Sequence, residues 1–351
     1  PHRDTLQSWH SRKQEVEQMM DRVCVVMPTY NERDNLEPTL TGVFVQNPGV
    51  DVLIVDDASP DGTGTLADVI SKATNMAPQL SVHVARGAQS KDTGFERAGT
   101  DAKVLSDAHV STPDLKIANR INGCTMDSRV FVLHRKGKLG LGSAYVDGFT
   151  WALDHGYTLI CEMDMDGSHR PDDLKRMLDR IEGNANIDLV VGSRRVPGGT
   201  TENWPWYRDL ISRVGSQYAR LMLGLKVRDM TSGFRVYRAG ILRKVNLHTI
   251  EDNGYVFQID MTRRVVAAGG TVVEMPIVFP ERARGESKMD GSIVREAIDK
   301  VTRWGFARMH RQLHDPDEIP REITDAKRQI EDGPDEVLDD ELVDEAEAGV
   351  D

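Results

Sequence analysis

Two aspartates separated by one residue stand directly after a predicted strand. Residues 157–163 predict the strand, and Asp164, Met165 and Asp166 follow it. Two carboxylates at this spacing can reach one hard cation, Mg²⁺ or Mn²⁺, which prefers oxygen ligands and bridges the oxygens of a diphosphate. The same pair could instead start a turn and cap the helix that opens at Pro171, so by itself it leaves both interpretations open.

Polar and acidic residues also follow two other predicted strands. Strand 23–27 is followed by Pro28-Thr-Tyr-Asn-Glu32, and strand 51–55 by Asp56-Asp-Ala-Ser-Pro-Asp-Gly62. In open α/β sheets, ligands bind outside the carboxyl ends of the strands. We therefore expect three acidic strand ends to converge on one edge of a sheet.

The sequence lacks the glycine-rich loops that bind nucleotides in two large enzyme classes. Gly140-Leu-Gly-Ser-Ala-Tyr145 has no third glycine of a dinucleotide fingerprint, and no G-x-x-x-x-G-K-[ST] phosphate loop occurs. These absences argue against a dehydrogenase and against a P-loop nucleotidase. Cys24, Cys124 and Cys161 lack metal-ligand spacing, which predicts buried thiols in a reducing, cytoplasmic setting.

Short β-branched runs alternate with helical patterns over most of the chain, as in a parallel sheet. The predicted strands are 23–27, 51–55, 80–84, 129–134, 157–163, 187–191, 233–238 and 271–278. The predicted helices are 34–45, 63–74, 142–154, 171–181, 206–223, 255–268 and 291–312. The fold class is therefore predicted to be α/β, with a Rossmann-like, mostly parallel central sheet of six or more strands flanked by helices.

Three segments lie outside this alternation and divide the chain. Residues 1–22 predict an amphipathic N-terminal helix ahead of a single catalytic domain at 23–312. Residues 87–128 show no clear periodicity and predict an insertion, either a surface excursion or a lid. Residues 313–351 predict an acidic, disordered tail.

The formal charge of −12 is unevenly spread. Residues 315–351 hold 16 Asp and Glu against 3 Lys and Arg, so this segment carries −13 and the preceding residues carry +1. The tail is either solvated or a docking segment for a basic partner. The body has no Lys- and Arg-rich run with interleaved aromatics, so we expect no nucleic-acid partner. Its apolar runs are far shorter than the roughly 20 residues that span a bilayer.

Ordered motifs over residues 23–308, apart from the insertion, resemble those of the inverting glycosyltransferases of family 2. Within that family they are most similar to the dolichol- or polyprenol-phosphate hexose synthases, especially the mannose-transferring ones. The motifs are Met27-Pro-Thr-Tyr-Asn-Glu32, Val55-Asp-Asp-Ala-Ser-Pro-Asp-Gly-Thr63, Lys138-Leu-Gly-Leu-Gly-Ser-Ala-Tyr145, Met163-Asp-Met-Asp-Gly-Ser-His169, Gly192-Ser-Arg194, Thr231-Ser-Gly-Phe-Arg235, Gly254-Tyr-Val-Phe-Gln258 and Arg284-Gly-Glu-Ser-Lys288. The resemblance implies a GT-A fold and transfer of a hexose from a nucleoside-diphosphate sugar to dolichyl or polyprenyl phosphate. GDP-mannose is the favoured donor and UDP-glucose the next, and the product would be a lipid-linked sugar donor for protein or cell-surface glycosylation.

The resemblance also implies which residues bind the donor. The family's positions for the base and ribose fall on Pro28, Tyr30, Glu32, Val55 and Asp57. The donor diphosphate would lie at Asp164, Met165 and Asp166.

For the cation on that diphosphate, Mg²⁺ or Mn²⁺, the resemblance implies Asp164 and Asp166 as ligands. Ser168 is a further candidate, in a Gly-Ser-His that replaces the Leu-Gln of some relatives. Arg284 matches a family arginine that reaches the leaving diphosphate, and Lys288 is a second cation nearby. The alternative for these two is a solvated basic loop.

On the acceptor side, the resemblance implies that Arg194, Arg208 and Ser212 bind the lipid phosphate. Ser212 lies one helical turn beyond Arg208, so both can face one ligand. A guanidinium group suits phosphate oxygens, and two of them could neutralise a dianion. The alternative is that both are ordinary surface arginines that pair with Asp209 or Glu202.

The sugar transfer that the resemblance implies needs little general acid–base catalysis. A phosphate monoester is largely deprotonated near neutral pH, so it needs no strong general base to act as a nucleophile. The expected catalytic residues are therefore Asp166, which holds the metal, and Arg194 and Arg208, which align the attacking oxygen. A single displacement would invert the anomeric centre.

Since the sequence predicts no spanning helix, we expect a cytoplasmic protein that associates peripherally with the membrane face, directly or through a membrane partner protein. Helix 291–312, or the loop near Trp204 and Trp206, could supply the contact, although that helix also fits a core-packing role. Two other functions stay open. One is a family 2 transferase with a hydroxyl acceptor, which would need a general-base carboxylate beside the acceptor. The other is a non-catalytic scaffold that keeps the sugar-nucleotide fold.

Overall fold

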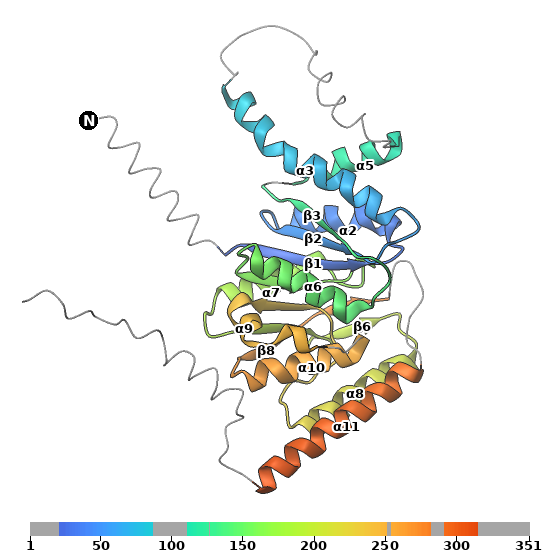
Figure 1. Cartoon of the computed structure of the whole chain (residues 1–351), viewed down its shortest axis with the longest axis vertical. Coiled ribbons are helices and arrows are strands. Elements are labelled where there is room, and N and C mark those ends of the chain that lie inside the picture. The colour runs from blue at the N-terminus through green and yellow to red at the C-terminus, as the bar shows by residue number, and fades with distance from the viewer. Residues whose placement is uncertain (1–20, 87–110, 126, 251–253, 282–290, 315–351) are drawn as a thin grey trace, which may run out of the picture. The chain divides into compact units, whose positions relative to one another are not determined.

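A central sheet between layers of helices forms the main part of the structure (Figure 1), a computed structural model that describes residues 21–86, 111–125, 127–250, 254–281 and 291–314. The strands are β1 (Val23–Thr29), β2 (Asp51–Asp56), β3 (Val130–His134), β4 (Leu159–Glu162), β5 (Leu189–Ser193), β6 (Thr200–Glu202), β7 (Arg235–Arg238), β8 (Val272–Pro276) and β9 (Val278–Pro280). The helices are α2 (Arg33–Gln46), α3 (Thr63–Arg86), α5 (Thr112–Asn122), α6 (Leu141–Asp154), α7 (Pro171–Glu182), α8 (Trp206–Leu223), α9 (Ala239–Lys244), the short 3₁₀ turn η1 (Leu247–Thr249), α10 (Gly254–Ala267) and α11 (Gly291–His314).

Seven strands make one sheet, in the order β3-β2-β1-β4-β7-β5-β8. All neighbours are parallel except β7, which runs antiparallel to both β4 and β5. Strands β6 and β9 form a separate parallel pair. The predicted α/β class with a mostly parallel sheet is confirmed, and the sheet has seven strands.

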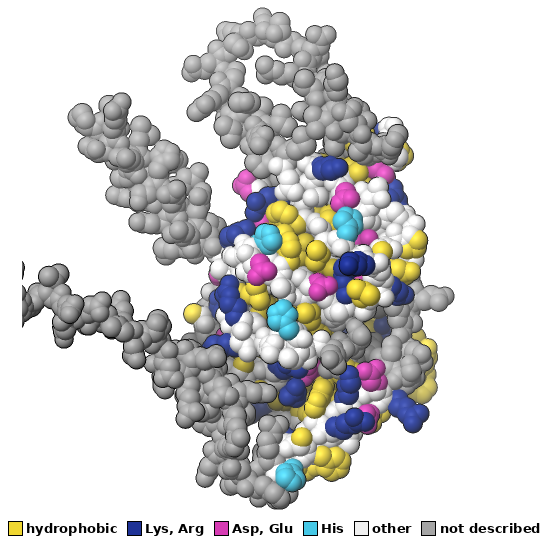
Figure 2. Space-filling model, in the orientation of Figure 1, with side chains coloured by type: hydrophobic (Ala, Val, Ile, Leu, Met, Phe, Trp, Pro, Cys, Tyr) yellow, Lys and Arg dark blue, Asp and Glu magenta, His cyan; other side chains and the backbone are white. Residues whose placement is uncertain are grey.

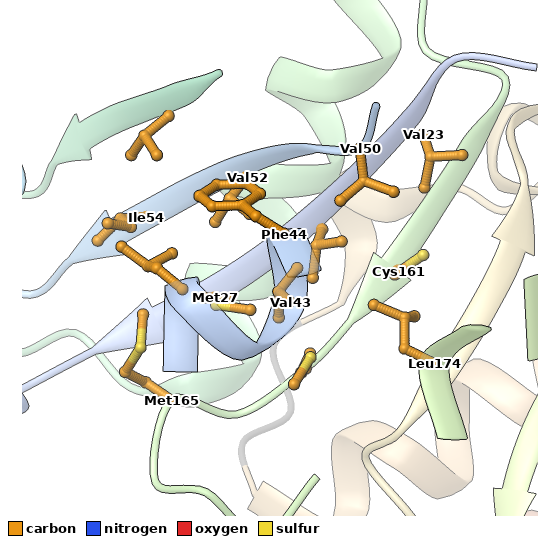
Figure 3. Packing of buried hydrophobic residues seen from close by; sticks show 14 of the residues in the cluster. Val23, Met27, Val43, Phe44, Val50, Val52, Ile54, Cys161, Met165 and Leu174 are labelled. Carbon is orange, nitrogen blue, oxygen red and sulfur yellow. The ribbon is translucent and has the colours of Figure 1, made fainter. Parts of the chain in front are cut away.

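Successive residues of the central strands enter two different cores, because side chains alternate across a sheet. In β1, Val23, Val25 and Met27 pack under α2, α3, α5 and α7. Figure 3 shows Met27 close to Val43 and Phe44 of α2. Cys24 and Val26 point to the other face, which α6, α9 and α10 cover. Because helices cover both faces, these strands are apolar along their whole length rather than in alternation.

A third, smaller core lies beside helices α8 and α11, which run side by side (Figure 1). Val301 of α11 packs with Ala219 and Leu223 of α8, and the Tyr218 and Thr302 hydroxyls lie 2.5 Å apart. The chain divides into two units, one up to Phe306 and one from Ala307. Of the second unit, only the end of α11 is described.

One predicted strand is wrong. Residues 80–84 continue helix α3, which runs on to Arg86. The strand that lies beside β2, on the side away from β1, is β3, which pairs with β2 from Val52 to Asp56.

Helix α5 forms within the segment 87–128, where the sequence showed no periodicity. The Ser111 side chain accepts a hydrogen bond from the Asp114 N–H at the start of this helix, and Ala118 and Ile121 are buried against the core. A Ser N-cap followed by Pro113 is a recognisable helix start that we did not use. Residues 87–110 and 126 of the predicted insertion, 1–20 of the predicted N-terminal helix and 315–351 of the predicted tail lie outside the described residues, so these predictions stand untested.

The described surface mixes charges of both signs on the face that carries α6, α9 and α10 (Figure 2). No described helix is both long and apolar enough to cross a bilayer. Exposed apolar side chains are instead concentrated on α8, where Trp206, Leu210, Val214 and Leu221 are each at least half exposed.

Candidate active site

The carboxyl ends of β1 and β2 lie beside each other and are tied together by hydrogen bonds. Pro28 is the register partner of Val55, and the Asp57 N–H donates to the Thr29 carbonyl at 3.0 Å. Further along, the N–H of Asn31 donates to Ser59 Oγ (3.1 Å) and that of Glu32 to Thr63 Oγ1 (3.0 Å). The structure therefore brings Pro28, Tyr30, Glu32 and Asp57 to one edge, as the sequence predicted. We call the carboxyl ends of β1, β2 and β4 the donor edge.

Val55 and Met165 differ from the other predicted donor residues because their side chains are not at the surface of this edge. Val55 is fully buried in the core under α6, and Met165 is 1% exposed and packs in the core under α2 (Figure 3). Only their backbones could contact a donor. The Met165 carbonyl already accepts a hydrogen bond from Thr39 Oγ1 at 3.0 Å.

Asp57 is held by an arginine that the sequence analysis did not single out. Arg135 Nη1 donates to Asp57 Oδ1, and both side chains are less than a tenth exposed. The same guanidinium donates to the Gly140 carbonyl (3.2 Å) and to Ser143 Oγ (2.7 Å). Gly140 has a φ of 105°, which favours glycine at the turn into α6. The signal was available, since Arg135 follows the predicted strand 129–134 just as the other site residues follow theirs.

A cation also lies over the predicted base-binding tyrosine. Lys138 Nζ is 4.2 Å from the centre of the Tyr30 ring. Lys138 belongs to the same loop as Arg135 and Gly140, so the loop that follows β3 completes the donor edge.

The two aspartates after β4 are each held in a fixed orientation. The Tyr145 hydroxyl donates to Asp164 Oδ1 at 2.9 Å, and the Asp164 N–H donates to His169 Nδ1 at 2.8 Å. Burial, and then the charge of Asp164, raises the pKa of Tyr145 well above its ordinary value, so the phenol stays protonated and donates. Asp166 Oδ1 accepts from both the N–H (3.0 Å) and the hydroxyl (2.5 Å) of Ser168.

The carboxylates of Asp164 and Asp166 fit one of two common modes of metal binding. Among the described residues there is no cluster of three or more His, Cys, Asp or Glu side chains that could enclose a metal. Mg²⁺, however, is commonly bound by one or two carboxylates, with substrate phosphates and water filling the remaining positions. Asp164 and Asp166 fit that second mode, and the Ser168 hydroxyl, the third candidate ligand, lies against Asp166.

Arg194 follows β5 and is bound to a buried carboxylate. Its Nε donates to Asp229 Oδ2 (2.8 Å) and its Nη2 to Asp229 Oδ1 (2.7 Å). Burial is the largest influence on Asp229 and acts to raise its pKa, but the contacts with Arg194 outweigh it and hold the pKa below its ordinary value. Asp229 is therefore an anion, and the sequence analysis did not single it out.

Arg208 lies close to Arg194 but is bound differently. The guanidinium carbons of Arg208 and Arg194 lie 3.9 and 5.4 Å from the centre of the Trp204 ring. Arg208 Nη1 is 3.9 Å from Glu281 Oε1, and its buried Nε has no hydrogen-bond partner in the described part of the chain. Trp204 Nε1 is a second buried donor without a partner there. Unsatisfied buried donors are uncommon, so this position is suited to an acceptor that is not part of the protein.

Ser212 joins the same cluster through Thr231. Arg194 Nη2 donates to Thr231 Oγ1 at 2.9 Å, and Ser212 Oγ lies 3.5 Å from that oxygen. We call Arg194, Arg208, Ser212, Thr231 and Trp204 the acceptor cluster. Neither arginine is an ordinary surface residue, and Asp209 pairs instead with Arg195 and Arg213.

An apolar groove of about 450 Å³ begins at this cluster and runs between α8 and α11. Trp204, Ser212 and Thr231 line both the groove and the cluster. The other lining residues are Leu210, Ile211, Val214, Gly215, Tyr218, Ile259, Ala297, Ile298 and Val301. The remaining predicted site residues, Arg284 and Lys288, lie outside the described residues.

Sequence comparisons match this chain to known glycosyltransferases. The family model of glycosyl transferase family 2 matches residues 24–122 and 114–245. The polyprenol monophosphomannose synthase of Mycolicibacterium smegmatis is 42% identical over 285 residues, covering 81% of this chain and 87% of that protein. The undecaprenyl-phosphate mannosyltransferase of Micrococcus luteus is 44% identical over 286 residues, covering 82% and 95%.

Solved structures share the fold at low sequence identity. Glucosyl-3-phosphoglycerate synthase from Mycobacterium tuberculosis, in complex with phosphoglyceric acid, aligns with a TM-score of 0.50 at 15% identity, over 83% of this chain and 82% of that one. A complex of the same enzyme with Mn²⁺, UDP-glucose and phosphoglyceric acid also aligns with a TM-score of 0.50, at 14% identity and the same coverage. Together with the family match, these alignments confirm the expected GT-A fold.

Proposed function

Because this chain belongs to glycosyl transferase family 2 and is therefore a glycosyltransferase, we propose that it transfers mannose from GDP-mannose to polyprenyl phosphate. The names of the two bacterial relatives support a mannose donor and a lipid phosphate acceptor. The observation that carries the proposal is that two buried arginines lie against Trp204, which also lines an apolar groove. A polyprenyl phosphate would match both features: its phosphate would meet the arginines, and its hydrocarbon chain would enter the groove.

Arg194, Arg208 and Ser212 would hold the acceptor phosphate. Arg208 Nε has no hydrogen-bond partner among the described residues, which supports an anion at this position, because a buried guanidinium donor without an acceptor is costly. The groove between α8 and α11 would take the first isoprene units. Its lining is apolar apart from a few hydroxyl groups, which suits a hydrocarbon and does not suit a sugar.

The donor edge would hold the nucleoside diphosphate. Tyr30, Glu32 and Asp57, with the backbones of Pro28 and Val55, would contact the base and ribose. Asp164 and Asp166 would hold Mg²⁺ or Mn²⁺ against the diphosphate, where the ion would offset negative charge on the leaving group. Arg284 and Lys288 would assist from their loop.

The reaction would be one in-line displacement. A phosphate oxygen attacks the anomeric carbon, the bond from that carbon to the donor diphosphate breaks, and its electron pair leaves with the nucleoside diphosphate. No proton has to move, because the second pKa of a phosphate monoester is about 6. Arg194 and Arg208 would align the attacking oxygen, so catalysis is mostly positioning and charge stabilisation. An α-linked donor would give a β-linked lipid phosphomannose.

Helices α8 and α11 would also bring the enzyme to its lipid. Trp206 is 76% exposed, Leu221 67% and Phe306 61%, and basic residues such as Arg213 flank them. Exposed aromatic and aliphatic side chains beside arginines suit a membrane interface. We propose peripheral association with the cytoplasmic membrane face, either direct or through a membrane partner protein.

Other functions make different demands on the same residues. A hydroxyl acceptor would need a general base near the acceptor cluster, and Glu281, an exposed carboxylate 3.9 Å from Arg208, would be the candidate. Transfer of glucose from UDP-glucose would change only the donor. A non-catalytic scaffold would not need the buried arginines and carboxylates of this site, so their presence argues against that role.

The test is transfer from radiolabelled GDP-mannose to polyprenyl phosphate, followed by extraction into organic solvent. Label in the organic phase with polyprenyl phosphate, and none with the matching polyprenol, is the expected result. Parallel reactions with UDP-glucose report the donor, and a soluble phosphate acceptor reports the need for a lipid tail. Absence of organic-phase label from either donor would contradict a lipid phosphate acceptor.

A further inference from the structure

The ion pair between Arg194 and Asp229 lies at the base of the acceptor cluster and is closed to water. The Asp229 side chain is 0% exposed and that of Arg194 is 3% exposed. Besides the two side-chain bonds, the Arg194 N–H donates to Asp229 Oδ2 at 2.9 Å. Three bonds to one carboxylate fix the plane of the guanidinium as well as its distance.

Hydrogen bonds to Glu274 on β8, the strand next to β5, fix the backbone at Asp229. The N–H groups of Arg228 and Asp229 donate to the two oxygens of Glu274, at 2.8 and 2.9 Å. Glu274 lies on β8, where it is the register partner of Val191 on β5. Since β5 also leads to Arg194, both members of the ion pair are anchored to one pair of strands.

A second link ties this ion pair to the rest of the acceptor cluster. Thr231 Oγ1 accepts from Arg194 Nη2 and lies 3.4 Å from Asp229 Oδ1. The same oxygen is within 3.5 Å of Ser212 Oγ and 3.4 Å of Ser216 Oγ on α8. A change in the position of Asp229 would therefore alter the positions of both Arg194 and Ser212.

We propose that Asp229 is a positioning residue for the transfer step: it sets the direction in which Arg194 meets the acceptor phosphate. The proposal rests on the proposed function, because it requires a phosphate at the acceptor cluster. The charge of Asp229 repels a phosphate dianion and so does not add to its affinity. Its contribution is the orientation of Arg194, and hence of the attacking oxygen behind the anomeric carbon.

A matched buried ion pair elsewhere serves as the control. Asp260 on α10 is 1% exposed and accepts from Arg263 (Nη2, 2.7 Å) and from Arg264 (Nε, 2.6 Å). Among the described residues, the hydrogen bonds and ion pairs of Asp260 go to Arg263 and Arg264 and to no member of the acceptor cluster. Loss of its charge should lower stability as loss of the Asp229 charge does, without a specific effect on the acceptor.

The experiment compares Asp229→Asn, Asp229→Glu and Asp260→Asn in the full chain, with separate kinetics for each substrate. Asp229→Asn should lower kcat/KM for polyprenyl phosphate about 10²-fold, while the Kd for GDP stays at the wild-type value. Asp229→Glu keeps the charge but moves the carboxylate, so it should show a smaller loss of the same kind. Because it keeps the ion pair, it carries the test if Asp229→Asn does not fold. Asp260→Asn should keep the wild-type kcat/KM for both substrates.

A double-mutant cycle separates positioning from an independent structural effect. If Asp229 acts through Arg194, adding Asp229→Asn to Arg194→Met should lower kcat/KM for polyprenyl phosphate no further. Losses that multiply in the double variant would overturn the proposal. So would an equal loss for donor and acceptor, or a loss in Asp260→Asn that matches the loss in Asp229→Asn.

The outcomes also separate this proposal from the proposed function. Wild-type transfer to polyprenyl phosphate with an unchanged acceptor kcat/KM in Asp229→Asn would overturn only the role of Asp229. Absence of wild-type transfer to polyprenyl phosphate from any donor would overturn both.

Discussion

The donor edge and the acceptor cluster each contain a charged side chain that is fixed by a buried ion pair, and the two side chains have opposite signs. On the donor edge, the residue that we propose to contact the donor is an acid, Asp57, and its buried partner is Arg135. In the acceptor cluster, the residue that we propose to contact the acceptor phosphate is Arg194, and its buried partner is Asp229. In each case a counter-ion fixes the charged group, since a buried charge without a partner is unstable. The two regions differ in what surrounds the pair: Trp204, Ser212 and Thr231 of the acceptor cluster also line an apolar groove.

The largest expected effect is on the donor edge, at the candidate metal ligands. Asp166→Ala should lower kcat about 10³-fold or more, because it removes a group that holds the ion against the leaving diphosphate. Asp172→Ala, at an exposed carboxylate six residues further on, is the control and should stay active. Turnover and thermal melting are measured together, and a folded Asp166→Ala that turns over normally would remove the metal from the mechanism. Chelation of the wild type with EDTA should abolish transfer, and Mg²⁺ or Mn²⁺ should restore it.

Arg208 tests the acceptor side of the comparison, because its counter-ion among the described residues, Glu281, is exposed rather than buried. Arg208→Met should lower kcat/KM for polyprenyl phosphate about 10²-fold. Its melting temperature should equal or exceed that of the wild type, since the substitution removes a desolvated charge whose Nε has no partner in the described part of the chain.

The control for Arg208 is Arg243→Met, at an exposed arginine on α9, which should change neither quantity. A marked loss of stability in Arg208→Met, with full activity, would mean that Arg208 is a structural residue.

Arg135 should affect the donor in the way that Asp229 is expected to affect the acceptor. Arg135→Met breaks a buried ion pair and should cost about 3 kcal/mol in the free energy of unfolding, read from urea denaturation. It should raise the KM for the nucleotide sugar and leave the KM for polyprenyl phosphate unchanged. A change confined to the acceptor KM would contradict the assignment of this pair to the donor edge.

The apolar groove should affect long acceptors more than short ones. Ile298 lines the groove from α11, and Ile298→Asp should lower kcat/KM about tenfold for a long polyprenyl phosphate, the equivalent of roughly two buried methylenes. A two-isoprene phosphate should lose less. Val266→Asp, at an exposed apolar side chain on α10 that is not part of the groove lining, is the control. Equal losses for both chain lengths would show that the groove does not hold the chain.

The smallest expected effect is that of the acidic C-terminal segment. A truncation after His314 should keep the kcat and both KM values of the full chain, because no residue that we propose to contact the donor, the acceptor or the membrane lies beyond Phe306. Loss of soluble activity in a folded truncation would contradict this.

The donor edge was largely predictable from the sequence, for a physical reason. Its side chains follow strands directly, so the position of Asp57, Asp164 and Asp166 depends only on where β2 and β4 end. Parallel strands align their carboxyl ends, so locating the strands is sufficient to gather the residues. The same rule would have identified Arg135 had we applied it to the strand that ends at His134.

The acceptor cluster was predictable only in part. The resemblance supplied Arg194, Arg208 and Ser212, but the residues that hold them come from distant segments. Asp229 is 35 residues from Arg194 and is brought to it by an antiparallel strand between β4 and β5, which local periodicity does not reveal. The wrong strand at 80–84 shows the same limit of local patterns. Val82 and Val84 are β-branched, which favours a strand, but these residues continue helix α3, and β3 forms the edge of the sheet.

The most direct test of the central claim is a crystal structure of the protein with GDP, Mn²⁺ and a short isoprenyl phosphate. The phosphate should lie within hydrogen-bonding distance of Arg194, Arg208 and Ser212, with its hydrocarbon chain between α8 and α11. A phosphate bound away from these residues, or arginines that stay turned away from it, would contradict a lipid phosphate acceptor at this site.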